Sequence, residues 1–289
     1  MSHRILLVAL AALTLTACAD RAAPLRIGAK GFAEQALLAE MVAALARRAG
    51  VDVAPIDTCG DTYACHRKLR DGEIDVMVEY TGTGLRFIGA VPGQDSMDDL
   101  RSLYAPLGLR WLNPIGFDNG YRVLVRADRP QRTIGDLTGV DGLRVVAPPE
   151  YVRRPGDGLG ALVTRYGLRL GAKPLLIEPP SERYQALVDG RADAAIGYAT
   201  DGAIAEMGLK VLADPAGFFP PYEGAVLVRE DAAKRHPGLI EALGALEGRI
   251  DTATMRDLNA RVQLEGRDVG VVARGFLATH DLVDPAPPG

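Results

Sequence analysis

A repeated pattern of leucine, aspartate, glycine and tyrosine residues occurs twice in the chain and constrains the fold more than any other feature. The stretches DGEIDVMVEYTGTG (71–84) and DGRADAAIGYATDG (189–202) each predict a turn, a buried strand and a glycine-containing end. The matching residues are Leu69, Asp71, Gly72, Asp75, Tyr80 and Gly84 in the first copy and, at one constant offset, Leu187, Asp189, Gly190, Asp193, Tyr198 and Gly202 in the second. We therefore expect one kind of structural unit to be built twice.

The first copy ends a series of alternating strands and helices. We expect strands at 25–30, 51–56 and 74–80, separated by helices at 34–48 and 62–70. Apolar residues of the first helix recur on one face at the helical spacing. The order β-α-β-α-β is typical of an α/β unit, in which helices cover a mostly parallel sheet.

The second copy ends a second series in the same order. Its last helix has Ser181 as the predicted N-cap, because a serine side chain can accept a hydrogen bond from the first helical turn. The predicted strands are 143–147, 174–179 and 192–200, and the predicted helices are 159–166 and 181–189.

Two extended segments connect the units. PIGFDNGYRVLVRAD (114–128) leads from the first unit to the second, and DPAGFFPPYEGAVLVRED (214–231) leads back. Two α/β lobes joined by two crossing segments predict a clamshell that holds a ligand between its lobes. Predicted helices at 239–249, 252–265 and 269–277 complete the first lobe. The predicted limits are 25–121 with 222–282 for lobe 1, 122–221 for lobe 2 and 283–289 for a tail.

The first residues have the features of an export signal. Arg4 precedes an apolar run that is too short to span a bilayer, and Leu-Thr-Ala-Cys ends at Cys18. This ending resembles the lipobox of bacterial lipoproteins, which implies removal of 1–17, a lipid on Cys18 and a tether at 18–24. The alternative is a plain secretory signal. The lipobox predicts a lipid-anchored protein in the periplasm or on the outer face of the cytoplasmic membrane.

Charge and cysteine content limit the partners. The net charge is −4 and no basic run occurs, which argues against nucleic acid as a partner. In an exported chain, Cys59 and Cys65 are spaced to close a small disulfide loop, and we expect them to do so. A metal site or a reactive thiol is the alternative, but no histidine or cysteine cluster accompanies them. We expect no metal and no cofactor.

Tyrosines mark the strand ends and the crossings. Tyr80 and Tyr198 end equivalent strands, Tyr121 lies on the first crossing and Tyr222 on the second. Ligands of open α/β sheets bind at the carboxyl ends of strands. A quaternary ammonium has no N–H to donate, so proteins hold it against the electron-rich faces of aromatic rings. The four rings therefore suggest a cage for such a cation.

Cationic and hydroxyl side chains accompany these tyrosines. Lys30 and Thr83 fall at strand ends, and one of Arg153 or Arg154 could face the same cleft. These groups could hold a carboxylate if the ligand carries one. The other tyrosines, including Tyr63, are interpreted as packing residues.

Six motifs in order identify a resemblance over nearly the whole mature chain. They are AKGFAEQALLAEM, EYTGTG, GFDNGYRVLV, EYVRRPGDGL, GYATDGAI and FFPPYEGAVLVR. They resemble the substrate-binding proteins of ABC osmoprotectant importers, which bind glycine betaine, choline or carnitine. The resemblance implies the two-lobe fold of a type II periplasmic binding protein, a monomer that delivers its ligand to a membrane permease.

The resemblance also implies the site residues. The aromatic cage of the family corresponds to Tyr80, Tyr121, Tyr198 and Tyr222, and its carboxylate-binding groups correspond to Lys30, Thr83 and Arg154. Asn119 matches a position whose backbone approaches the ammonium.

Other functions remain as alternatives. The same clamshell could bind a different cationic or amino-acid-like solute, or could serve as a sensor domain. A hydrolase of choline esters is the enzymatic alternative, but the chain has no Gly-x-Ser-x-Gly, His-Glu-x-x-His or Walker A motif. We therefore expect a binding protein and no enzyme.

Overall fold

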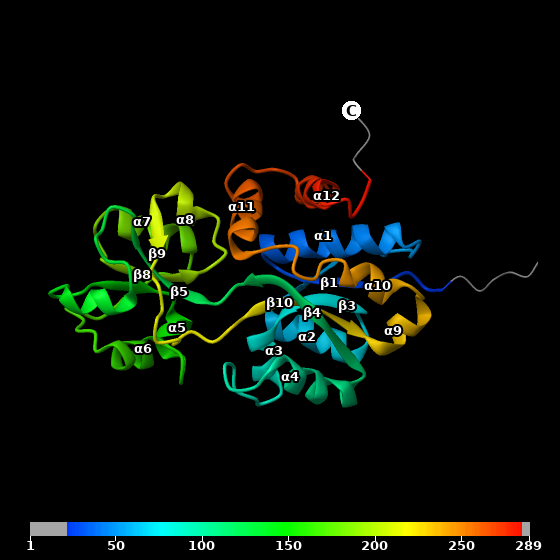
Figure 1. Cartoon of the computed structure of the whole chain (residues 1–289), viewed down its shortest axis with the longest axis horizontal. Helices are drawn as coiled ribbons and strands as arrows, with labels where there is room; N and C mark the ends of the chain where they lie inside the picture. The colour runs from blue at the N-terminus through cyan, green and yellow to red at the C-terminus, as the bar shows by residue number, and fades with distance from the viewer. Residues whose placement is uncertain (1–21, 285–289) are drawn as a thin grey trace, which may run out of the picture.

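The computed structural model describes residues 22–284, which form two α/β lobes (Figure 1). Lobe 1 contains the first and last parts of the described chain, and lobe 2 contains the middle part. Each lobe is built on one five-stranded sheet. The predicted α/β fold of two lobes with two crossing segments is confirmed. Cys18 and the predicted signal at 1–17 lie outside the described residues.

The sheet of lobe 1 has the order β2-β1-β3-β10-β4. β1 pairs in parallel with β2 and β3, and β10 lies antiparallel between β3 and β4. The strands are β1 (Ile27–Lys30), β2 (Asp57–Gly60), β3 (Val76–Tyr80), β4 (Leu109–Asp118) and β10 (Glu223–Arg229). The helices are α1 (Ala33–Arg48), α2 (Thr62–Asp71), α3 (Thr81–Phe87), α4 (Met97–Tyr104), a 3-10 turn (Ala105–Leu107), α9 (Glu230–Arg235), α10 (Leu239–Gly244), α11 (Thr252–Gln263) and α12 (Val269–Thr279).

Lobe 2 repeats this arrangement in the order β7-β6-β8-β5-β9. β6 pairs in parallel with β7 and β8, and β5 lies antiparallel between β8 and β9. The strands are β5 (Tyr121–Arg126), β6 (Val145–Ala147), β7 (Leu175–Leu176), β8 (Ala194–Tyr198) and β9 (Leu209–Val211). The helices are a 3-10 turn (Ile134–Gly139), α5 (Pro149–Arg153), α6 (Leu159–Tyr166), α7 (Pro180–Val188) and α8 (Ala203–Glu206).

The crossing segments explain why both sheets are mixed. Asn119 and Gly120 lead from β4 of lobe 1 directly into β5 of lobe 2, and residues 212–222 lead from β9 back to β10. Each crossing therefore delivers the antiparallel strand of the lobe that it enters. The alternating pattern predicted mostly parallel sheets, because it described the β-α-β-α-β units and not the strands that the crossings add.

Both faces of each sheet are buried. In lobe 1, one face packs against α1 and the C-terminal helices, with Leu38, Met255 and Leu277 in the cluster. The other face packs against α2 and α4 through Leu69 and Leu100. Lobe 2 likewise has one apolar cluster on each face of its sheet. Burial of these apolar side chains supplies the main driving force for the folding of each lobe.

The repeated aspartates hold the first strand of each unit in register. Asp75 accepts hydrogen bonds from the backbone N, Nε and Nη2 of Arg26 at 2.9, 2.9 and 2.7 Å. Asp193 accepts the same three from Arg144 at 3.0, 3.0 and 3.1 Å. Both aspartates precede their strands, at the opposite end from the terminal tyrosines. The two aspartates therefore stabilise the sheets and do not line the end of the strands where the tyrosines lie.

The predicted strand at 51–56 is wrong. Leu25 forms an isolated parallel bridge with Val53, but the strand proper, β2, begins at Asp57. Pro55 interrupts the pairing because proline has no N–H to donate to a neighbouring strand.

Two helix predictions also need correction. Pro179 occupies the cap position of α7, which begins at Pro180, so Ser181 lies within the first turn and is not the N-cap. Proline suits the first position of a helix, whose N–H would have no helical partner. The helix predicted at 239–249 ends, as α10, at Gly244.

The structure joins Cys59 and Cys65 in a disulfide, with Cα atoms 5.0 Å apart. The bond ties β2 to the following helix α2 beside one edge of the lobe 1 sheet. In residues 22–284, no three His, Cys, Asp or Glu side chains gather as a metal site.

Candidate functional site

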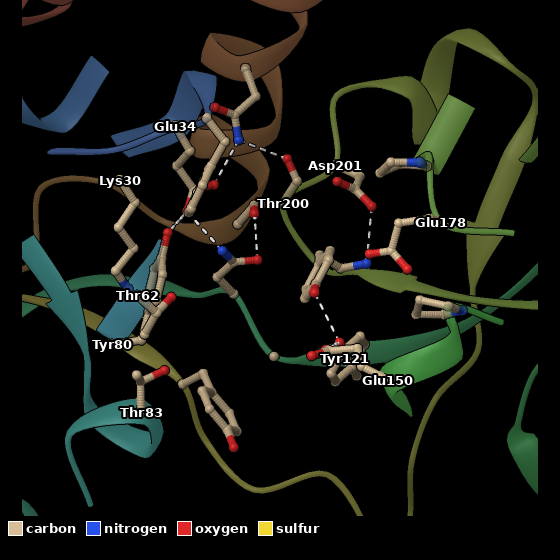
Figure 2. Close-up of a pocket in the computed structure, with 18 of the residues that line it drawn as sticks. Lys30, Glu34, Thr62, Tyr80, Thr83, Tyr121, Glu150, Glu178, Thr200 and Asp201 are labelled. Carbon is tan, nitrogen blue, oxygen red and sulfur yellow. Dashed lines mark hydrogen bonds between the residues drawn. The ribbon is translucent and has the colours of Figure 1, made fainter. Parts of the chain in front are cut away.

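A cavity of about 510 Å³ is lined by both lobes and both crossing segments (Figure 2). All eight predicted ligand-binding residues line it: Lys30, Tyr80, Thr83, Asn119, Tyr121, Arg154, Tyr198 and Tyr222. Of the two adjacent arginines left open by the sequence, Arg154 lines the cavity, whereas Arg153 is exposed elsewhere. The fold thus gathers residues that are far apart in the sequence, and their role with a ligand stays a prediction.

A buried carboxylate links the two lobes beside the cavity (Figure 2). Glu34, at the start of α1, accepts hydrogen bonds from Tyr80 Oη at 2.6 Å, Asn119 Nδ2 at 3.0 Å and Asn259 Nδ2 at 2.7 Å. Asn119 Oδ1 accepts in turn from Thr200 Oγ1 of lobe 2 at 3.0 Å. Burial raises the pKa of the Glu34 carboxyl, and the hydrogen bonds that it accepts oppose this only in part.

Lys30 lies at the end of β1 with its ammonium already paired. It forms an ion pair with buried Glu79, which also accepts the backbone N–H of Tyr80 at 2.7 Å. The Lys30 Nζ atom is 4.7 Å from the centroid of the Tyr80 ring. A lysine ammonium has three donors, so this pair leaves further N–H groups. Thr83 lines the same side of the cavity from the first turn of α3.

Tyr121 and Tyr198 form a stacked pair in lobe 2. Their ring centroids are 4.6 Å apart, the planes differ by 26°, and the two hydroxyl oxygens are 2.9 Å apart. The pair arises because Tyr121 begins β5 directly opposite Tyr198, which ends β8. The Tyr121 hydroxyl donates a hydrogen bond to the Glu150 carboxylate. Burial raises the pKa of Tyr198 to about 12, so both tyrosines are neutral at physiological pH.

Arg154 brings a second cation to the aromatic rings. Its Cζ atom is 5.4 Å from the Tyr121 ring centroid and 5.5 Å from that of Tyr222. Its Nε donates to Asp157 at 2.8 Å, and Asp157 also accepts from Arg86 Nη2 of lobe 1 at 2.6 Å. Arg86 Nε donates to the Tyr222 hydroxyl at 2.9 Å. This cluster joins the two lobes through Arg86 of lobe 1 and Asp157 of lobe 2.

Several cavity residues were not predicted from the sequence. Glu34 and Glu150 lie within quoted motifs, so their positions were visible although their role as acceptors of tyrosine hydroxyls was not. Asp201 follows Tyr198 and accepts its backbone N–H at 3.0 Å. Tyr63, interpreted as a packing residue, is 72% exposed and lines the cavity. Its position near the start of α2 gave no sign of this, because the sequence does not show which residues of a helix line a cavity between distant segments.

The geometry suits noncovalent binding of a small molecule. The cavity offers aromatic faces, cations with unused donors and several carboxylates, contributed by two lobes that two crossing segments join. These features define a solute-binding protein of the two-lobe periplasmic type, in which closure encloses the ligand.

Comparison with known proteins identifies the family. Residues 23–279 match the family described as the substrate binding domain of ABC-type glycine betaine transport system, and the chain belongs to this family. A glycine-betaine-binding protein of Pseudomonas aeruginosa is 31% identical, over 91% of this chain and 90% of its own length. The carnitine transport binding protein OpuCC of Listeria monocytogenes is 28% identical, over 90% of this chain and 88% of its own length.

A solved structure agrees in fold. The crystal structure of a glycine betaine/carnitine/choline ABC transporter protein has a TM-score of 0.81 at 27% identity, over 90% of this chain and 100% of its own. The resemblance and the type II periplasmic binding-protein fold are therefore confirmed. The relatives are transport binding proteins and not enzymes.

The family membership places the chain in a transport system. Substrate-binding proteins of ABC importers work outside the cytoplasm with a small-molecule ligand and a permease. Between residues 22 and 284, the structure contains no helix of the length and apolar character needed to cross a bilayer.

Proposed function

We propose that the protein captures a quaternary-ammonium osmoprotectant similar to glycine betaine and delivers it to the permease of an ABC importer. The single observation that carries this proposal is the convergence of Tyr80, Tyr121, Tyr198 and Tyr222 on one cavity. Tyr80 ends β3 of lobe 1, Tyr121 and Tyr198 lie on adjacent strands of lobe 2, and Tyr222 ends the second crossing. The curated relatives named for glycine betaine and carnitine support the same ligand class.

Cation–π attraction is the proposed source of affinity for the ammonium. The protein's own cations already lie within reach of three of these rings: Lys30 near Tyr80, and Arg154 near Tyr121 and Tyr222. Ring faces that attract these side chains can attract a ligand cation, with about 0.5–2 kcal/mol for each contact. The raised pKa values of Tyr121 and Tyr198 keep the rings neutral, so no phenolate is needed.

The carboxylate of a betaine would bind Lys30, Thr83 and Arg154 in this proposal. Lys30 is paired with Glu79 and Arg154 with Asp157, but each cation retains further donors. A carboxylate therefore gains charge-assisted hydrogen bonds without requiring either internal pair to break. The backbone of Asn119 would lie beside the ammonium.

The first measurement is isothermal titration calorimetry of the purified protein with glycine betaine, proline betaine, carnitine and choline. We expect one of these compounds to bind with micromolar or tighter affinity. No heat with any of them, in folded and ligand-free protein, would contradict a quaternary-ammonium ligand and favour another cationic or amino-acid-like solute.

The cage itself is tested by replacing Tyr198. Tyr198→Ala should weaken binding of the preferred compound by about 1–2 kcal/mol, which is roughly 5- to 30-fold, because one ring face is lost. Tyr198→Phe keeps the ring and should keep most of the affinity. Equal affinity of wild type and Tyr198→Ala would remove this tyrosine from the cage.

We also propose that a lipid on Cys18 anchors the protein outside the cytoplasmic membrane and that it acts as a monomer. The motif that ends at Cys18 supports the anchor. The intact mass of protein extracted from membranes tests it, since a mass without lipid contradicts the proposal. Sedimentation of the purified protein tests the monomer.

A further inference from the structure

Two of the four tyrosines around the cavity donate their hydroxyl groups to carboxylates. The Tyr80 hydroxyl donates to the Glu34 carboxylate at 2.6 Å, and the Tyr121 hydroxyl donates to the Glu150 carboxylate. Both carboxylates belong to residues that line the same cavity as the rings, and Figure 2 shows each of them beside its tyrosine. These two rings are therefore hydrogen-bonded to negative charge at the wall of the cavity.

The other two tyrosines differ in the groups that their hydroxyls contact. The Tyr222 hydroxyl accepts from the guanidinium groups of Arg86, at 2.9 Å, and of Arg154. The Tyr198 hydroxyl lies 2.9 Å from that of Tyr121. Within residues 22–284, neither of these two hydroxyls donates directly to a carboxylate. The cavity thus offers a comparison between rings with and without a carboxylate partner.

The hydrogen bonds to Glu34 are those of a carboxylate anion. Its oxygens accept from Tyr80 Oη at 2.6 Å, Asn119 Nδ2 at 3.0 Å and Asn259 Nδ2 at 2.7 Å. All three partners act as neutral donors, so they satisfy the oxygens without cancelling the charge. Glu34 is only 3% exposed, so water screens that charge little.

The neighbouring charged groups do not neutralise Glu34. The Lys30 Nζ atom is 4.7 Å from the centroid of the Tyr80 ring, but this ammonium is paired with buried Glu79. Asp201 is near enough to act on Glu34 and is itself a carboxylate, so it adds negative charge. Within the described part of the chain, Glu34 has no ion pair, and its charge is free to attract a ligand cation.

A hydrogen bond to a carboxylate changes what a tyrosine ring offers to a cation. The anion polarises the O–H bond and makes the phenol oxygen and the ring more electron-rich. A cation above the ring is attracted by this electron-rich face. The carboxylate also attracts the cation directly, and the attraction is strong where water is excluded. Both effects favour a positively charged head group over an uncharged group of the same shape.

We propose that Glu34, and more weakly Glu150, act as positioning residues that make the cavity selective for positive charge. Glu34 orients the Tyr80 ring and the Asn119 side chain and supplies a negative charge that complements the ammonium of the ligand. Glu150 does the same for Tyr121, but it is exposed, so water screens its charge. This inference rests on the proposed function, because it takes the ammonium to lie among the tyrosines.

The test compares glycine betaine with tert-butylacetate, in which a carbon atom replaces the ammonium nitrogen and the shape is kept. Calorimetry measures glycine betaine, and an NMR titration measures the weaker analogue. Glu34→Gln keeps an acceptor for the Tyr80 hydroxyl but removes the charge. It should weaken glycine betaine binding about tenfold and change binding of the analogue less than about twofold. If the wild type prefers choline, choline and its tert-butyl counterpart form the pair.

Phenylalanine substitutions test whether the bond to the carboxylate carries the effect. Tyr80→Phe keeps the ring but breaks its contact with Glu34, and it should weaken glycine betaine binding about threefold or more. Tyr198→Phe removes a hydroxyl that does not donate directly to a carboxylate, and it should keep most of the affinity. Equal losses in the two variants would contradict a special role of the carboxylate bond.

Further variants separate this inference from folding and from the proposed function. Glu40→Gln removes a carboxylate from the same helix α1 outside this cavity and should leave both affinities unchanged. Thermal unfolding verifies that each variant is folded, and Glu150→Gln should show a smaller loss in the same direction even if Glu34→Gln does not fold. Equal losses of glycine betaine and its analogue in Glu34→Gln, or no loss of glycine betaine, would overturn the role of Glu34. Absence of binding of every quaternary ammonium to the wild type would instead overturn the proposed function.

Discussion

Glu34 is an example of a single residue whose environment changes its chemistry. Its carboxyl is buried under three donors, Tyr80, Asn119 and Asn259, and no cation pairs with it in residues 22–284. Burial raises its pKa because the charged form loses its hydration, and nearby Asp201 adds to this rise. Protonation is therefore easier in the folded protein than in the unfolded chain.

This shift predicts a dependence of stability on pH. A raised folded-state pKa means that the unfolded chain loses the proton first as pH rises above the ordinary value of 4.5. The contribution of Glu34 to the free energy of unfolding should therefore decrease as pH increases through the folded-state pKa. Urea unfolding across this range should show the decrease in wild type relative to Glu34→Gln, which does not titrate there. A constant difference between the two proteins would contradict the shift.

At the scale of elements, the paired strands of each unit depend on the repeated aspartates. Asp75 is fully buried and accepts from Arg26 and from Arg235 of α9, at 2.7 Å in the latter case. Burial raises the pKa of Asp75. The hydrogen bonds and the charge of Arg26 lower it by more than burial raises it, so the net shift is downward. The carboxylate thus connects β1, β3 and a C-terminal helix.

Replacement of Asp75 tests this connection. Asp75→Asn should lower the free energy of unfolding by about 1–3 kcal/mol, because the buried side chain loses its charge and one of the two oxygens that accept hydrogen bonds from Arg26 and Arg235. Asp193→Asn should cost less, since its carboxylate is 14% exposed and water can replace part of the lost bonding. Urea denaturation provides the measurement. Asp128→Asn, in an exposed pair with Arg126, is the control, and a cost as large there would show that the position in the sheet is irrelevant.

At the scale of the whole molecule, polar contacts hold the lobes together. Asp157 of lobe 2 accepts from Arg86 of lobe 1 at 2.6 Å, while Arg256 of α11 donates to the backbone oxygen of Ala199 at 2.7 Å. Such contacts contribute modestly one by one, because groups such as Arg86 remain partly exposed to water. They are suited to a clamshell that must open again.

Removal of one contact should shift the balance between open and closed forms. Asp157→Ala removes the carboxylate that Arg86 and Arg154 share, and we expect it to favour the open form by about 1 kcal/mol or less. Small-angle X-ray scattering of the ligand-free protein should then give a larger radius of gyration. Asp257→Ala breaks an ion pair within α11 and should change nothing. An unchanged radius in Asp157→Ala would mean that this pair does not influence closure.

The sequence by itself determined the two α/β units and the positions of the tyrosines. Local periodicity reveals alternating strands and helices, and the carboxyl ends of neighbouring parallel strands share one edge, so Tyr80 and Tyr198 could be placed at a cleft. The tertiary structure decided which groups pair: Lys30 with Glu79, Arg154 with Asp157, and Arg183 with no carboxylate in residues 22–284. Local pattern does not contain this information, because these pairings and the burial of Arg183 depend on how distant segments and two lobes pack in space.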